Sequence, residues 1–235
     1  MPYPVGEKVA AVFFSDVHLG ALVCYAERLV TMLNKFNPDF IRIIGDLYDD
    51  CNLHRLKRKH WELLDLLRKR SKHKDVLHIH GNHDDLLESL GEFLGIQVVS
   101  ESIWEYKDLK ILLIHGHQFD RYIAEKPIIT WVASELYNLI QRFGGKKQSL
   151  ARFLKRQSKQ YLRLSREISL KLVRYAKDKN VGINTIIFGH THEIMDEMID
   201  GIRVMNDGCV TDNPSTCIIC DMEGNLYHYE MKEFE

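Results

Sequence analysis

The sequence lacks the features that mark membrane-spanning, secreted or disordered proteins. No apolar run approaches the roughly 20 residues of a membrane-spanning helix, and the N-terminus carries no basic, then apolar, then small-residue targeting signal. Five cysteines at scattered positions are unlike the disulfide framework of a small secreted domain. With 45% hydrophobic and 28% charged residues, the chain is expected to form one folded domain over 1–235, with reduced thiols, in the cytoplasm.

The net charge of −1 hides a strongly basic segment. Between residues 142 and 179 the chain carries thirteen Lys or Arg, against only Glu167 and Asp178 as acids. The stretch 128–179 has a nearly continuous helical pattern, broken only at Gly144-Gly145. We expect a helical, basic insertion over about residues 121–179. The alternative is an ordinary solvated helical face.

Five short apolar runs each end in a cluster of Asp, Asn or His. They are rich in β-branched residues and closed by Gly or Asp, which is typical of buried strands. With their clusters they span residues 9–18, 40–49, 76–84, 111–117 and 186–192. Helical patterns at 21–36 and 56–70 separate the first three, which predicts β-α units with at least partly parallel strands.

The later part of the chain is expected to be mostly antiparallel. Residues 98–106 predict one strand, paired with 110–114 across a turn at Lys107-Asp108-Leu109. Asp200-Gly201 and Glu223-Gly224-Asn225 predict two further hairpins. Cys217 and Cys220 have the spacing of a metal knuckle or redox pair, but their segment alternates like a core strand and has no second pair.

The clusters predict a metal centre. Ligands of open α/β sheets lie at the carboxyl ends of the strands, so distant clusters can meet in one pocket. Carboxylate, amide oxygen and imidazole suit Mn, Fe or Zn. Asp46 could bridge two ions about 3.5–4 Å apart, an arrangement suited to hydrolysis of a phosphoester. His78 and His80 are expected to be structural, and Asp84 to support the ligands or begin a helix.

The five motifs, in this order, resemble those of the calcineurin-like metallophosphoesterase superfamily. The motifs are Asp16-x-His18, Gly45-Asp46-x-x-Asp49, Gly81-Asn82-His83-Asp84, His115-Gly116-His117 and Gly189-His190-x-His192. The resemblance implies an α/β fold: a four-layer αββα sandwich of two mixed sheets, with the insertion as a helical cap. It implies two divalent transition metal ions, most simply Mn, with Fe and Zn as alternatives.

The resemblance also implies the role of each residue. The first ion would be held by Asp16, His18, Asp46 and His192, and the second by Asp46, Asn82, His115 and His190. His83 would contact the phosphate and act as general acid, with Asp49 fixing its orientation.

Within the superfamily, the insertion and the ending Asn206-Asp207-Gly208 look like the UDP-2,3-diacylglucosamine pyrophosphatase group of lipid A synthesis. Members of that group have Arg at the position of His83 and Asp at the position of His117. These two differences make the chain look more like the broader relatives of that group. The resemblance implies a phosphorylated, lipid-linked substrate, and the basic stretch favours an anionic membrane surface as a partner, on the inner face of the cell membrane. The residues expected to contact substrate are His117, Arg152, Lys155, Arg156 and Lys159.

Several interpretations remain open at this point. His117 either lies in the pocket or only satisfies its turn. The alternative activities are those of a nuclease, because Lys and Arg contacts to phosphate dominate nucleic-acid affinity and the basic stretch would suit it, or of a small-molecule phosphodiesterase. A non-catalytic scaffold of the same superfamily is a further alternative.

Overall fold

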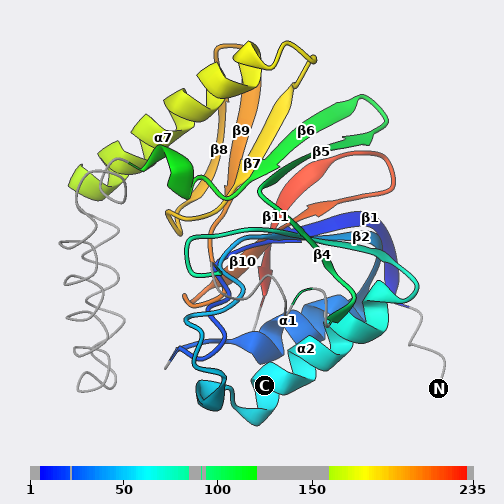
Figure 1. Ribbon diagram of the computed structural model, residues 1–235. Coiled ribbons are helices and arrows are strands. Elements are labelled where there is room, and N and C mark those ends of the chain that lie inside the picture. Colours follow the sequence, from blue (N-terminus) through cyan, green and yellow to red (C-terminus); the bar gives the residue numbers. More distant parts are fainter. Residues whose placement is uncertain (1–5, 22, 85–90, 92–93, 121–158, 232–235) are drawn as a thin grey trace.

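A computed structural model describes residues 6–21, 23–84, 91, 94–120 and 159–231. Two mixed β-sheets pack face to face, and helices cover the outer surface of each (Figure 1). Three apolar cores separate the resulting four layers, one between the sheets and one beneath each helical layer. The expected α/β sandwich of two mixed sheets is confirmed.

The six-stranded sheet has the order β11-β10-β1-β2-β3-β4. Its strands are β1 (Glu7–Phe14), β2 (Phe36–Ile44), β3 (Asp75–Ile79), β4 (Gln97–Val99), β10 (Ser215–Cys220) and β11 (Leu226–Met231). The first four pair in parallel, and β10 joins β1 and β11 antiparallel. The six residues 9–14 of β1 are all buried, because both faces of this central strand are covered.

Two helices cover the outer face of this sheet. They are α1 (Ala26–Lys35) and α2 (Arg58–Ser71), with the short 3-10 helix η1 (Leu53–Arg55) before α2. Leu29, Leu33, Leu63 and Leu67 are fully buried against the sheet. The first helix starts five residues later than predicted, because residues 16–19 form backbone hydrogen bonds with the loop after β2.

The five-stranded sheet has the order β5-β6-β7-β9-β8. Its strands are β5 (Glu101–Tyr106), β6 (Leu109–Ile114), β7 (Thr185–Phe188), β8 (Ile194–Ile199) and β9 (Ile202–Asp207). The three predicted hairpins are confirmed. The predicted single strand over 98–106 is wrong: it is divided at Ser100 between β4 of one sheet and β5 of the other. Strand β9 also pairs in parallel with β7. Local turn signals do not predict this long-range pairing.

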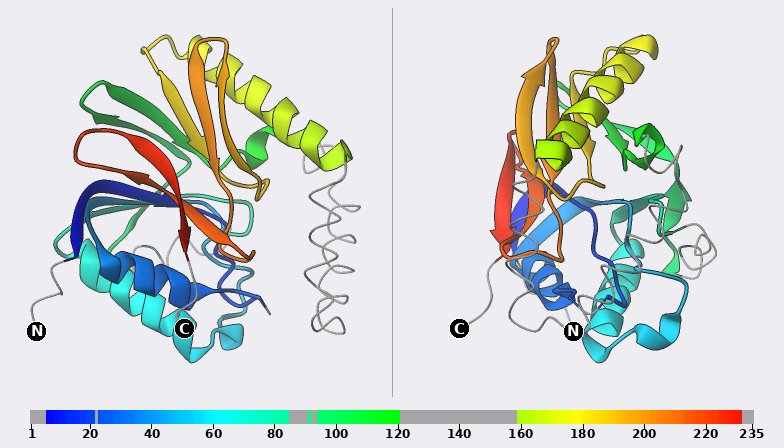
Figure 2. Two further views of the ribbon diagram at one scale, coloured as in Figure 1. Left: turned by 180° about the vertical axis from the view of Figure 1, so that it is seen from behind. Right: turned by 90° about the vertical axis from the view of Figure 1, so that its left-hand side faces the viewer.

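Helix α7 (Lys159–Asp178) forms the fourth layer. Ile168, Leu172, Val173 and Ala176 are buried against the five-stranded sheet, and the N-terminal end of α7 extends past the strands (Figure 2). Of the expected insertion, residues 121–158 lie outside the described residues. No helix in the described ranges is both long and apolar enough to cross a membrane.

Cys217 and Cys220 face opposite sides of β10. Cys217 lies in the core beneath α1 and α2, and Cys220 lies between the sheets. Both are free thiols. They form no metal knuckle or redox pair, which confirms the core-strand interpretation.

Candidate metal centre

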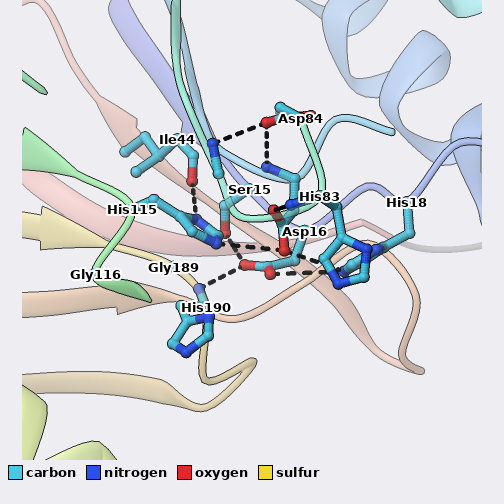
Figure 3. Close-up of polar contacts among 12 residues, drawn as sticks. Ser15, Asp16, His18, Ile44, His83, Asp84, His115, Gly116, Gly189 and His190 are labelled. Atoms are coloured by element: carbon cyan, nitrogen blue, oxygen red, sulfur yellow. Dashed lines mark hydrogen bonds and ion pairs between the residues drawn. The ribbon is translucent and has the colours of Figure 1, made fainter. Parts of the chain in front are cut away.

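The predicted ligands come together where the two sheets meet. Asp16 and His18 follow β1, Asp46 follows β2, and Asn82 and His83 follow β3, all in the six-stranded sheet. In the five-stranded sheet, His115 follows β6, and His190 and His192 follow β7. Side chains from both groups lie beside one another in Figure 3. The carboxyl ends of two sheets, rather than one, therefore form the site.

Five predicted ligands have left-handed backbone conformations. The φ angles are 50° at Asp16, 50° at His18, 52° at Asp46, 65° at His190 and 54° at His192. Non-glycine residues adopt this region rarely, at a cost of about 1–3 kcal/mol each, and such residues cluster at functional sites. The turns are held by main-chain hydrogen bonds, such as His18 N–H to the Asp46 carbonyl at 3.0 Å. The fold thus stabilises sharp turns that aim these side chains at one point.

Asp46 lies at the centre of the cluster. Its Oδ2 is 3.3 Å from His115 Nε2 and 3.8 Å from His18 Nε2. Its Oδ1 accepts a hydrogen bond from the His83 main-chain N–H at 2.9 Å. Gly81 makes this approach possible, since a Cβ there would lie 2.2 Å from Asp46 Oδ1. One carboxylate therefore faces histidines from both sheets.

Asp16 forms a second focus of the site. Its Oδ1 lies 3.0 Å from His192 Nε2 and 3.7 Å from His18 Nε2. Its Oδ2 accepts a hydrogen bond from the His190 main-chain N–H at 2.9 Å. The side chain is fully buried. One oxygen of Asp16 is thus held by the protein, while the other faces two imidazoles.

Hydrogen bonds to main-chain carbonyls orient two imidazoles. His115 Nδ1 is 2.8 Å from the Ile44 carbonyl, and His83 Nδ1 is 2.7 Å from the Asp49 carbonyl. A carbonyl only accepts, so Nδ1 carries the hydrogen in both rings. Gly45 leaves room for His115, since a Cβ there would lie 2.3 Å from its Nδ1. In neutral His115 the lone pair is therefore on Nε2, the atom that faces Asp46.

Opposite charges shift the pKa values of the clustered groups. Burial alone would raise the pKa of Asp16 and Asp46, but the nearby histidines outweigh it and hold both well below the usual range. Burial likewise opposes charge on His115, yet Asp46 and Asp16 raise its pKa to about 9. Burial would also lower the pKa of His18, but Asp16, Asp49 and Asp46 outweigh it and raise this pKa well above its usual value. The carboxylates remain ionised, and protons compete with any cation for the imidazoles.

Several buried donor atoms of the site lack hydrogen bonds. Within the described part of the chain, Asp16 Oδ1, His18 Nε2, Asn82 Oδ1 and His115 Nε2 are buried and make none. Such orphaned atoms are uncommon in folded proteins and call for a partner. In three groups the donor atoms all lie within 4.8 Å of one another: Asp16 with His18 and His192, Asp16 with Asp46 and His115, and His18 with Asp46 and His83. The residues fit a divalent transition metal.

Comparison with known protein families agrees with this geometry. A model described as calcineurin-like phosphoesterase matches residues 10–193. The chain belongs to this family. Membership makes it a metal-dependent phosphoesterase, and the donor groups above are the candidates for its divalent metal site.

Solved structures share the fold of this phosphoesterase at low sequence identity. An archaeal phosphodiesterase matches with a TM-score of 0.52 and 16% identity, over 94% of this chain and 98% of the other. The E. coli phosphoesterase Yfce has the same TM-score and identity, over 94% and 99%. A single mutant of Vps29 from Entamoeba histolytica matches with a TM-score of 0.54 and 16% identity, over 94% and 91%. No curated protein matches the sequence.

His190 differs from the other predicted ligands of the phosphoesterase. Its Nε2 lies 2.9 Å from Asp120 Oδ2, and its ring points away from Asp16 in Figure 3. Only Nδ1 is then available to an ion. A carboxylate on the outer nitrogen of a histidine ligand is a common support in metal sites. Asp120 was not predicted, because a lone Asp five residues after His115 carries no motif.

The contact between Asp49 and His83 is made by the main chain. The Asp49 carboxylate instead lies 3.6 Å from His18 Nδ1 and 2.8 Å from Arg55 Nη2. Asp49 therefore reaches both histidines, His83 through its carbonyl and His18 through its side chain. The motif spacing predicts that Asp49 lies at the site. It does not indicate whether the carbonyl or the carboxylate of Asp49 contacts a given imidazole.

Asp84 holds two loops together behind the site, the one after β2 and the one after β3. Its buried carboxylate accepts hydrogen bonds from the main-chain N–H groups of Asp46, Gly81 and Tyr48 at 2.8, 2.9 and 3.3 Å, and lies 3.0 Å from His78 Nε2. Burial raises its pKa, but His78 and Gly81 outweigh this and lower it. Asp84 thus supports the ligands, one of its two expected roles, and His78 is structural.

The predicted substrate residues are only partly described. His117 begins the 3-10 helix η2 (His117–Phe119), and its ring centroid lies 5.4 Å from that of His115. Burial, with His115 and His190, lowers its pKa to about 3, so it is neutral. Arg152, Lys155 and Arg156 lie outside the described residues. Lys159 starts α7, and its side chain lies outside the description as well.

Proposed function

We propose that this phosphoesterase hydrolyses a phosphodiester or diphosphate bond with two divalent ions that share Asp46. The first ion would be held by Asp16, His18, Asp46 and His192, and the second by Asp46, Asn82, His115 and His190. The position of the Asp46 carboxylate carries this proposal, since it faces His18 on one side and His115 on the other. When bound, such a pair of ions would generate the nucleophile and neutralise charge on the attacking and leaving oxygens.

We assign the general acid role to His83. Its side chain is partly buried, and its Nδ1–H is committed to the Asp49 carbonyl, so Nε2 is the atom that can exchange a proton with substrate. Its ring packs edge-on against His18, with 4.8 Å between centroids. A protonated His83 beside the ions would donate to the leaving oxygen, a contribution of about 10²–10⁴-fold in rate.

The proposed substrate is a nucleotide-linked lipid such as UDP-2,3-diacylglucosamine, on a membrane surface. Supporting this, α7 exposes Arg163 and Leu170, which line an open hollow with Arg166 and Glu167. Because Arg166 is paired with Glu197, Arg163 is the cation that would meet a phosphate there. Cationic and apolar groups side by side suit a ligand with both phosphates and acyl chains. Mn is the proposed ion; Fe and Zn accept the same ligands.

A nuclease is less well supported by the same helix. Arg166 is paired with Glu197 at 2.6 Å, and Lys177 with Asp200 at 3.5 Å. Paired cations have less free charge to offer to a phosphate backbone, whose binding depends on many unpaired Lys and Arg.

One assay tests the proposal. Mn-loaded protein is incubated with UDP-2,3-diacylglucosamine, a simple aryl phosphodiester and single-stranded DNA, with H83A as the matched control. We expect turnover of the first two, fastest for the lipid, and its loss in H83A. Turnover of the simple diester alone would remove the lipid assignment. No turnover of any substrate, with both metal sites filled, would reject the function.

A further inference from the structure

A second buried carboxyl group, that of Asp207, is linked to Asp16 through the hydroxyl of Ser15. Ser15 Oγ is 2.5 Å from Asp16 Oδ2 and 2.8 Å from Asp207 Oδ1. Ser15 follows β1 and Asp207 ends β9, so this contact joins the two sheets beneath the site (Figure 3 shows Ser15 beside Asp16). All three residues are fully buried. The roles proposed above account for neither Ser15 nor Asp207.

The three groups do not have enough hydrogens if both carboxyls are ionised. A serine hydroxyl has one hydrogen and donates it to one acceptor. Two ionised carboxylates would leave one of the two contacts as oxygen against oxygen, with no hydrogen between them. One carboxyl group must therefore carry a proton.

The surroundings indicate which carboxyl group it is. Asp16 faces His18 and His192 and accepts the His190 main-chain N–H, all of which favour its ionised form. Asp207 Oδ2 is buried and has no hydrogen-bond partner among the described residues. Burial and the charge of Asp16 raise the pKa of Asp207 well above its usual value, against the smaller opposing effects of Ser15 and His115. A buried neutral oxygen without a partner costs far less than a buried charge.

We infer that Asp207 is a neutral carboxylic acid that positions Asp16 through the hydroxyl of Ser15. The Asp207 O–H donates to Ser15 Oγ, and the Ser15 O–H donates to Asp16 Oδ2. With the His190 N–H, this gives Asp16 Oδ2 two donors and leaves Oδ1 for the ion. Asp207 and Ser15 are positioning residues, and their role rests on the proposed function of Asp16 as a metal ligand.

Close packing around Ser15 holds the hydrogen bonds between Asp207, Ser15 and Asp16 in place. A Cβ on Gly189 would lie 2.3 Å from Ser15 Oγ and 2.7 Å from Asp16 Oδ2, so the Gly189 backbone sits directly against the contact. Asn206, next to Asp207, donates to the Gly189 carbonyl at 2.7 Å. The end of β9 thus supports both Asp16 and the loop that carries His190 and His192.

Four variants of the full chain separate this role from a general loss of packing. Asp207→Asn keeps a donor for Ser15 Oγ, whereas Asp207→Ala and Ser15→Ala remove the link to Asp16. Thr216→Val is the control, because the buried Thr216 hydroxyl donates to the Asp207 carbonyl at 2.7 Å and is not part of the link. Mn²⁺ binding is measured by calorimetry, and the carboxylic acid C=O stretch of the Mn-loaded protein by infrared spectroscopy.

We expect a protonated-carboxyl band in wild type and Thr216→Val that is absent in Asp207→Asn. Asp207→Ala and Ser15→Ala should weaken Mn²⁺ binding at the Asp16 site by about 10–100-fold, as the loss of a supporting partner does in other metal sites. Asp207→Asn and Thr216→Val should bind like wild type. A wild-type spectrum without the band, or Asp207→Asn binding as weakly as Asp207→Ala, would overturn the inference. Neither readout uses turnover, so a failed substrate assay would count against the proposed function alone.

Discussion

The two candidate metal sites differ in how complete they are. The donors of Asp16, His18 and His192 already lie within 4.8 Å of one another. In the other site, Asp46 and His115 are close, but the Nε2 of His190 is bound to Asp120. The first site is therefore preorganised, whereas the second depends on a ring that a carboxylate outside the motifs holds in place. We expect the first ion to bind more tightly than the second.

The difference also follows the two sheets. Loops of the six-stranded sheet hydrogen-bond directly to one another, as in Asp16 N–H to the Gly45 carbonyl at 3.1 Å. The loop with His190 and His192 is held by Asp16, which accepts the His190 N–H at 2.9 Å, and it also contacts α7, where Thr191 Oγ1 lies 3.3 Å from Ser165 Oγ. This half of the centre therefore also depends on its contact with α7.

Removing the shared ligand should have the largest effect. Asp46→Ala is expected to empty both sites and reduce turnover to background, because both proposed ions use this carboxylate. Elemental analysis after gel filtration measures the metal content, with the half-exposed Asp65→Ala on α2 as the control. One full equivalent of metal remaining in Asp46→Ala would show that the sites do not share it.

Removing the proposed general acid should affect rate and not metal. His83→Ala is expected to lower turnover by about 10²–10⁴-fold while both ions stay bound. The exposed His73→Ala, just after α2, should behave like wild type. Equal loss of metal in His83→Ala and Asp46→Ala would contradict the assigned role of His83.

Removing the Asp120 carboxylate that supports His190 should increase the difference in metal affinity between the two sites. Asp120→Asn is expected to weaken the second site by about 10–100-fold and leave the first unchanged, because the amide orients the ring less firmly than a carboxylate. Two-step Mn²⁺ calorimetry resolves the two events. An equal loss of affinity in both Mn²⁺ binding steps would contradict the proposed difference in preorganisation between the two sites.

Metal affinity should increase with pH. The pKa of His115 is raised to about 9 in the metal-free protein, so below that pH a proton must leave before Nε2 can bind an ion. Affinity should rise by up to about tenfold per pH unit until about pH 9. The raised pKa stabilises the metal-free fold below about pH 6.5, and this stability is lost as pH rises through 9. The gain in melting temperature on adding Mn²⁺ should therefore be larger at pH 9 than at pH 7, and a constant gain would contradict the assignment.

The sequence predicts most strands well because they are local patterns, and the structure brings candidate ligands at the ends of these strands together. An apolar run that ends in Asp46 or His115 identifies a strand and its functional end together. Pairing between distant strands is not local, so the switch between sheets at Ser100 was missed. Asp120 and Asp207 were missed for the same reason, since each meets the site only through a residue 70 or 192 positions away.

The metal stoichiometry of the wild-type protein tests the central claim most directly. Freshly purified protein, loaded with Mn²⁺ and freed of excess, is analysed for metal content and by electron paramagnetic resonance. Two ions per chain with a spin-coupled signal are predicted, because Asp46 would bridge them. A single uncoupled ion per chain, or none, would contradict the account.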